Sequence, residues 1–155
     1  MLLPLCALLV AAQSPASLEA SIARLPVRAG VEAYPSVADP LTLPLTARAA
    51  RARVLRSGDG TELYLENGLV RRTIRGEPAC ATVALDDLVS PRSLLRGPAP
   101  EARVRIDGRD LVVGGLVGQP NRAYLTDAWI EGLEREPGAL RLVGLEVGVP
   151  QERFA

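Results

Sequence analysis

Two-residue turn signals between short alternating runs constrain this sequence more than any other feature. Asp107-Gly108 separates an alternating run that ends at Ile106 from an apolar run over Leu111–Val113. Asp-Gly favours a type I′ turn, because both central residues of that turn need a positive φ. Asn67-Gly68 is a second pair of this kind, and it also lies between two short runs. Both pairs predict antiparallel β-hairpins.

The rest of residues 51–155 continues this pattern of short strands and turns. Turn residues recur about every eight to twelve residues, which is typical of a sandwich rather than of a parallel α/β sheet. One helix is expected after Thr126, an N-cap residue, and it is expected to end at Pro137-Gly138. The sequence therefore predicts a mainly-β fold over 51–155, an incomplete antiparallel β-sandwich with one short helix. The expected strands are 51–56, 61–66, 69–74, 81–85, the two arms of the hairpin at Asp107, and 140–147.

The N-terminal third of the chain differs from the rest in composition. Residues 1–12 are almost wholly apolar and end in Val10-Ala11-Ala12. This ending is typical of a signal-peptidase site, whereas a membrane span needs about 20 apolar residues. We expect a signal peptide cleaved near Ala12 and a secreted or periplasmic bacterial protein with no membrane span; a buried N-terminal element is the alternative. Residues 13–50 are rich in Ala and Pro and predict an arm or linker, with a short helical pattern over Ser17–Leu25.

Composition narrows the chemistry that the chain can perform. The sequence has 18 basic and 18 acidic residues and no His. Balanced charge argues against a nucleic-acid partner, and without His there is no histidine general base and no His-rich metal site. Cys6 lies in the expected leader, which leaves Cys80 as a single thiol, expected to act as a small buried hydrophobe. We therefore predict no catalytic residue, no metal site and no cofactor.

Two further motifs favour structural interpretations. Asp86-Asp87 is a pair of adjacent carboxylates, but neighbouring residues of a strand point to opposite faces, so the two cannot flank one bond together. They are expected to close their strand into the next turn. Gly114-Gly115 and Gly118 lack the strand–helix context of a dinucleotide fingerprint and predict a bulge or sharp bend.

The segment after these glycines carries the candidate binding residues. Asn121, Arg122, Tyr124 and Trp129 are the candidate carbohydrate-binding residues. Aromatic rings stack on the apolar faces of sugars, while Asn and Arg bond their hydroxyls. A place for Trp129 in the core is the alternative.

Several stretches resemble one family. The run 65–74, LENGLVRRTI, resembles the opening hairpin of the N-terminal β-sandwich of large secreted bacterial glycoside hydrolases related to the α-galactosidase clan. The stretch GGLVGQPNRAYL, the helix with Trp129 and residues 146–154 are similar to the same region, so the resemblance covers 63–154. In such enzymes the sandwich packs on a downstream (β/α)8 barrel that supplies the catalytic aspartate and acid/base. No barrel follows here, so the resemblance implies a truncated domain without activity of its own.

The resemblance implies a non-catalytic N-terminal domain of a secreted glycoside-hydrolase-like protein. Such a domain would support a catalytic barrel and contact carbohydrate, so its partners would be a carbohydrate or the missing catalytic domain. Two alternatives stay open: a free-standing carbohydrate-binding module that uses Tyr124 and Trp129, and a structural or interaction domain of the cell envelope. A binding module needs an exposed Trp129 ring, whereas a broad apolar patch on one sheet face favours packing against a barrel.

Overall fold

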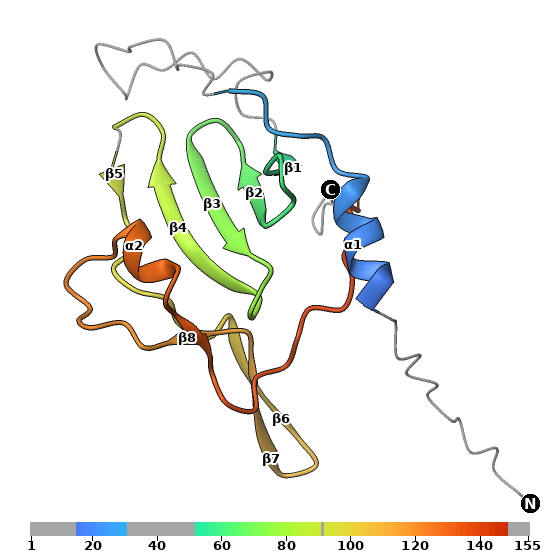
Figure 1. The fold of residues 1–155 in the computed structure, drawn as a ribbon, viewed down its shortest axis with the longest axis vertical. Helices are drawn as coiled ribbons and strands as arrows, with labels where there is room; N and C mark the ends of the chain where they lie inside the picture. The colour runs from blue at the N-terminus through green and yellow to red at the C-terminus, as the bar shows by residue number, and fades with distance from the viewer. Residues whose placement is uncertain (1–14, 31–51, 91, 149–155) are drawn as a thin grey trace, which may run out of the picture.

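The computed structural model of this chain describes residues 15–30, 52–90 and 92–148 (Figure 1). Its largest element is a five-stranded antiparallel sheet in the order β1-β2-β3-β4-β5. Each strand of this sheet pairs with the next one along the chain. Its strands are β1 (Arg53–Arg56), β2 (Glu62–Glu66), β3 (Val70–Arg75), β4 (Ala81–Asp87) and β5 (Arg92–Ser93).

Two smaller antiparallel sheets and two short helices complete the described residues. The sheets pair β6 (Ala102–Ile106) with β7 (Arg109–Val113), and β8 (Leu116–Val117) with β9 (Glu134–Arg135). The helices are α1 (Pro15–Ala23) and α2 (Asp127–Ile130). The prediction of a mainly-β fold built from antiparallel strands is thereby confirmed. The expected signal peptide, 1–12, and most of the expected arm, 13–50, lie outside the described residues.

Both predicted hairpins form, but only one uses the turn type that its sequence favours. Asp107 has φ 49° and Gly108 has φ 74°, as a type I′ turn requires. At the other hairpin Gly68 has φ 92°, whereas Asn67 is not among the described residues with positive φ. The side-chain oxygen of Asn67 instead accepts hydrogen bonds from the backbone N–H groups two and three residues further on, both at 3.0 Å. Asn67 therefore acts as an Asx-turn residue.

Strand alternation gives the five-stranded sheet two unlike faces. Residues directly opposite each other on paired strands share a face, and Val54 lies opposite Leu65 just as Glu66 lies opposite Arg71. We call one side the apolar face; it carries Val54, Leu63, Leu65, Val70, Ile74 and Leu85, and also the polar residues Arg56, Arg72, Thr82 and Asp87. We call the other the charged face; it carries Glu62, Tyr64, Glu66, Arg71, Arg75 and Asp86.

A second layer covers one end of the charged face. The hydrophobic core joins β4 to this layer, and Figure 1 shows α2 beside the lower parts of β4 and β5, with β8 below them. Ala81 of β4 pairs with Arg75, which places the layer on the charged face. The core consists of the buried residues Ala79, Ala81, Val83, Leu116 and Leu133, with Ile130 of α2 packed against them.

The predicted glycine bend connects β7 to this second layer. Gly114 and Gly115 have φ values of 63° and 107°, in the left-handed region that favours glycine. Both glycines are buried. A Cβ on Gly114 would overlap the backbone carbonyl oxygen of Cys80, so the chain passes close to the start of β4 here. The sharp bend is therefore confirmed, and its cause is close backbone approach.

Two expectations for the C-terminal part were wrong. The helix after Thr126 ends at Ile130 rather than near Pro137, because residues 134–135 pair with β8 as strand β9. No strand forms over 140–147; only Leu140 makes an isolated parallel bridge, with Val113. The sequence of this segment alternates as a strand does, but apart from the single bridge at Leu140 it pairs with no strand among the described residues.

The N-terminal part that the structure describes lies against the sheet. The helical pattern over Ser17–Leu25 corresponds to α1, and Leu25 is buried. The next residues run parallel to β1: Arg56 N donates to Pro26 O at 3.0 Å, and Arg28 N donates to Arg56 O at 2.9 Å. Neither this helix nor any other among the described residues has the length and apolar character to cross a membrane.

Candidate functional site

The predicted carbohydrate-binding residues lie on the loop between β8 and α2 and on α2 itself. Asn121, Arg122 and Tyr124 are exposed, and Trp129 of α2 is half-buried. The rings of Tyr124 and Trp129 stack with centroids 4.8 Å apart and an interplanar angle of 29°. The structure therefore brings the two aromatic residues together, and Tyr124, which is 50% exposed, is the more exposed of the two. One face of the Trp129 ring therefore lies against Tyr124.

A glutamine that sequence reasoning did not single out holds this loop. The Gln119 amide nitrogen donates to the backbone carbonyls of Arg96 and Tyr124, both at 2.9 Å. The Asn121 side-chain oxygen accepts from the backbone N–H of Ala123 at 3.0 Å. The loop geometry thus depends on side chains within it, and the Asn121 side-chain oxygen already accepts a hydrogen bond from the loop backbone.

A ladder of alternating charges crosses the charged face from β1 to β4. Arg53 lies opposite Glu66, Glu66 opposite Arg71, and Arg71 opposite Asp86. Arg53 donates to Glu66 at 2.7 Å, and Arg71 donates to Asp86 through two nitrogens at 2.8 and 3.2 Å. Opposite charges on directly paired residues stabilise a sheet by about 0.2–1 kcal/mol for each pair. Arg71 lies on β3, the middle strand of the sheet, so its charge is paired within the sheet.

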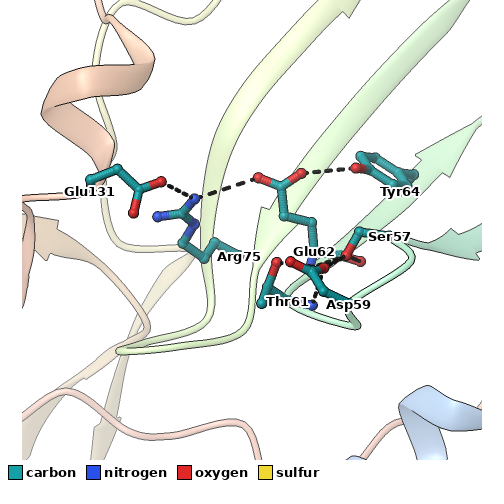
Figure 2. Close-up of polar contacts among 7 residues, drawn as sticks. All are labelled: Ser57, Asp59, Thr61, Glu62, Tyr64, Arg75 and Glu131. Atoms are coloured by element: carbon teal, nitrogen blue, oxygen red, sulfur yellow. Dashed lines mark hydrogen bonds and ion pairs between the residues drawn. The ribbon is translucent and has the colours of Figure 1, made fainter.

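Tyr64 lies within this ladder. Its ring has the Arg28 guanidinium 5.2 Å and the Arg71 guanidinium 6.0 Å from its centroid. Its hydroxyl donates to Glu62 at 2.9 Å (Figure 2). Burial raises the pKa of the Tyr64 phenol above its ordinary value. The Arg28 contact, a cation–π interaction, fastens the segment after α1 to the sheet.

Arg75 joins the two layers of the fold. Figure 2 shows its guanidinium between Glu131, which follows α2, and Glu62 of β2. The nitrogen–oxygen distances are 3.0 Å to Glu131 and 3.8 Å to Glu62. These carboxylates share one arginine, an arrangement that positions α2 over the sheet.

Two aspartates hold turns. Asp59 accepts from the Ser57 hydroxyl at 2.5 Å and from the Thr61 backbone and hydroxyl at 3.1 and 2.9 Å (Figure 2). These bonds, that from Ser57 foremost, lower the pKa of Asp59 to about 2. Asp87 accepts from Ser90 in the same manner, and this bond lowers the pKa of Asp87. A general acid at neutral pH needs a raised carboxyl pKa, whereas the pKa values of Asp59 and Asp87 are lowered.

The expectation that Asp86 and Asp87 close the strand into the next turn was right for Asp87 and wrong for Asp86. Asp86 pairs with Arg71 on the charged face, whereas Asp87 closes the turn after β4. Cys80 is half-buried, and burial raises the pKa of its thiol. Among the residues that the structure describes, no group of His, Cys, Asp and Glu side chains is arranged to hold a metal ion.

No family model matches this chain, and neither a curated protein nor a solved structure matches it. The resemblance to glycoside hydrolase N-terminal domains therefore stays a prediction.

Proposed function

We propose that this chain is a non-catalytic domain of a secreted glycoside-hydrolase-like protein and that it contacts carbohydrate through Tyr124. The observation that carries the proposal is the stacked pair: Tyr124 is 50% exposed while Trp129 supports its ring at 4.8 Å. A rigid, half-exposed aromatic ring offers large contact area at a low cost in conformational entropy. The exposed Arg122 on the same loop supplies donors for sugar hydroxyls.

The chain carries its own reporter for this interaction. Trp129 is the single tryptophan of the sequence and stacks directly on Tyr124. A sugar on the outer side of Tyr124 changes the environment of the pair, so titration with soluble oligosaccharides should change Trp129 emission with a saturable dependence. A glycan array identifies the sugars to titrate.

Two substitutions at one position separate stacking from other effects. Tyr124→Ala removes the ring and should abolish saturable binding, whereas Tyr124→Phe keeps the ring and should retain it. Circular dichroism confirms that both variants are folded. Equal binding by wild type and Tyr124→Ala, or no response to any glycan on the array, would contradict the proposal.

A second candidate function, packing against another domain, is favoured by the apolar face. Leu65 and Val70 are 38% and 41% exposed on this face. Adjacent exposed apolar side chains on a sheet are typical of surfaces that another domain covers. Leu65→Ser should reduce binding of a hydrophobic dye, and Leu140→Ser, which changes an equally apolar residue 41% exposed away from this sheet, serves as the control. Equal dye binding by wild type and Leu65→Ser would contradict this role.

A further inference from the structure

The β6–β7 hairpin has an outer edge that the rest of the fold leaves uncovered. Figure 1 shows the hairpin extending away from the five-stranded sheet. On the β7 side, Leu140 bridges to Val113 and donates from its backbone nitrogen to Val112 O at 2.7 Å. On the other side, β6 has no strand partner among residues 15–30, 52–90 and 92–148. Backbone groups of alternate β6 residues therefore point outward, because a strand directs them to both sides.

This edge is held in place without needing a partner. The type I′ turn at Asp107-Gly108 sets the register at the tip, and Arg105 bonds Asp110 across the strands through two contacts of 2.6 and 2.9 Å. At the base, Glu101 accepts from the backbone and hydroxyl of Thr82 at 2.6 and 2.7 Å. Both ends of β6 are thus fixed, so a pairing partner would meet a preformed strand.

The side chains of β6 give the edge a definite chemistry. Ala102, Val104 and Ile106 share one face, and Ile106 is 53% exposed. Arg103 and Arg105 occupy the other face. Arg105 lies opposite Asp110, but Arg103 lies opposite Val112 and so has no carboxylate directly across from it. We propose that the outer edge of β6 binds an extended segment of another protein in which acidic and apolar residues alternate.

Charge decides between this partner and a second copy of the chain. Two antiparallel β6 strands that keep their faces in phase place arginine directly opposite arginine in every register that pairs three or more β6 residues, and like charges at that position destabilise the pair. Edge charges of this kind prevent self-association. An acidic segment places a carboxylate opposite Arg103, while its apolar residues extend the face of Val104 and Ile106. The same charges that disfavour a dimer thus select the partner.

The test uses the full chain and two capped peptides, one alternating glutamate with valine and one alternating lysine with valine. NMR titration measures affinity, and amide hydrogen exchange locates the contact. The glutamate peptide should bind, with weaker binding at high salt, and should protect amides of β6. The lysine peptide should not bind.

Substitutions then assign the binding to Arg103. Arg103→Glu should weaken the glutamate peptide about tenfold, since one favourable cross-strand pair becomes a repulsive one. Arg103→Lys should keep the affinity within about threefold. Arg109→Glu makes the same charge change on β7 at the turn and should have little effect.

Several results would overturn the inference. Equal binding of the two peptides, equal loss in Arg103→Glu and Arg109→Glu, or binding without protection of β6 amides would each exclude strand addition at this edge. So would sedimentation data showing that the wild-type chain dimerises through β6, because the second copy would then be the occupant.

Discussion

Replacing Gly114 by alanine tests the close approach between the bend and the start of β4. Gly114 has φ 63°, and its added Cβ would overlap the backbone carbonyl oxygen of Cys80. The left-handed conformation alone costs an alanine about 1–2 kcal/mol. Relieving the overlap requires the bend to move away from β4, which disturbs packing in the adjacent core by about 1–3 kcal/mol more. We expect the free energy of unfolding to fall by about 2–5 kcal/mol, a large share of the stability of a small domain.

Gly108→Ala is the matched control for this substitution. Gly108 has φ 74°, yet nothing lies within 4 Å of the position that its Cβ would take. This variant should lose only the conformational part, about 1–2 kcal/mol. Urea unfolding followed by far-UV circular dichroism and by Trp129 emission gives both values. Equal unfolding midpoints for the two variants would refute the argument, because the difference between them measures the overlap with Cys80.

Two further expectations concern charged groups. Glu101→Gln keeps the shape of the side chain but removes the charge that faces Arg72 and Thr82. The free energy of unfolding should therefore fall by about 1–2 kcal/mol. Glu134→Gln, which makes the same change at an exposed position, is the control and should leave the urea midpoint unchanged. Because the folded pKa of Asp59, about 2, lies below its ordinary value, this residue stabilises the fold above about pH 4, and that contribution is lost as the pH falls toward 2. Melting temperatures measured from pH 6 to pH 2 should therefore drop more for wild type than for Asp59→Asn, and parallel curves would contradict this.

Local signals account for the parts of the fold that the sequence predicts well. The strands expected at 51–56, 61–66 and 69–74 form at 53–56, 62–66 and 70–75. Turn residues and alternation lie within each hairpin, so no distant information is needed to place them. The segment 140–147 has similar alternation but forms no strand. A strand needs a partner, and local sequence does not show whether one is in reach.

The candidate site likewise contains one part that local sequence predicts and one part that it does not. Asn121, Arg122, Tyr124 and Trp129 are close in sequence, and the structure stacks the two aromatic residues as one unit. The role of Gln119 depends on Arg96, a residue distant along the chain, and no local pattern indicates it.

The charge ladder on the charged face could not be predicted from local sequence for a related reason. A type I′ turn with Asn67 and Gly68 as its central residues would place Glu66 opposite Leu69, whereas in the structure Glu66 lies opposite Arg71. Arg53 and Asp86 join this pair only through the registers of two further strand pairs. Arg71 and Arg72 look identical in the sequence. Their different partners, Asp86 and Glu101, follow from the opposite faces to which they point.

The two faces of the five-stranded sheet also bear on what this chain does. The charged face bears ion pairs in its central strands and receives part of the second layer, joined to it by Arg75 and Glu131. The apolar face retains Leu65 and Val70 with more than a third of their surface exposed. An isolated domain gains more by burying apolar side chains than by pairing charges, since surface ion pairs contribute little. This distribution supports a domain that works against another surface, and it makes the apolar face the first place to look for one.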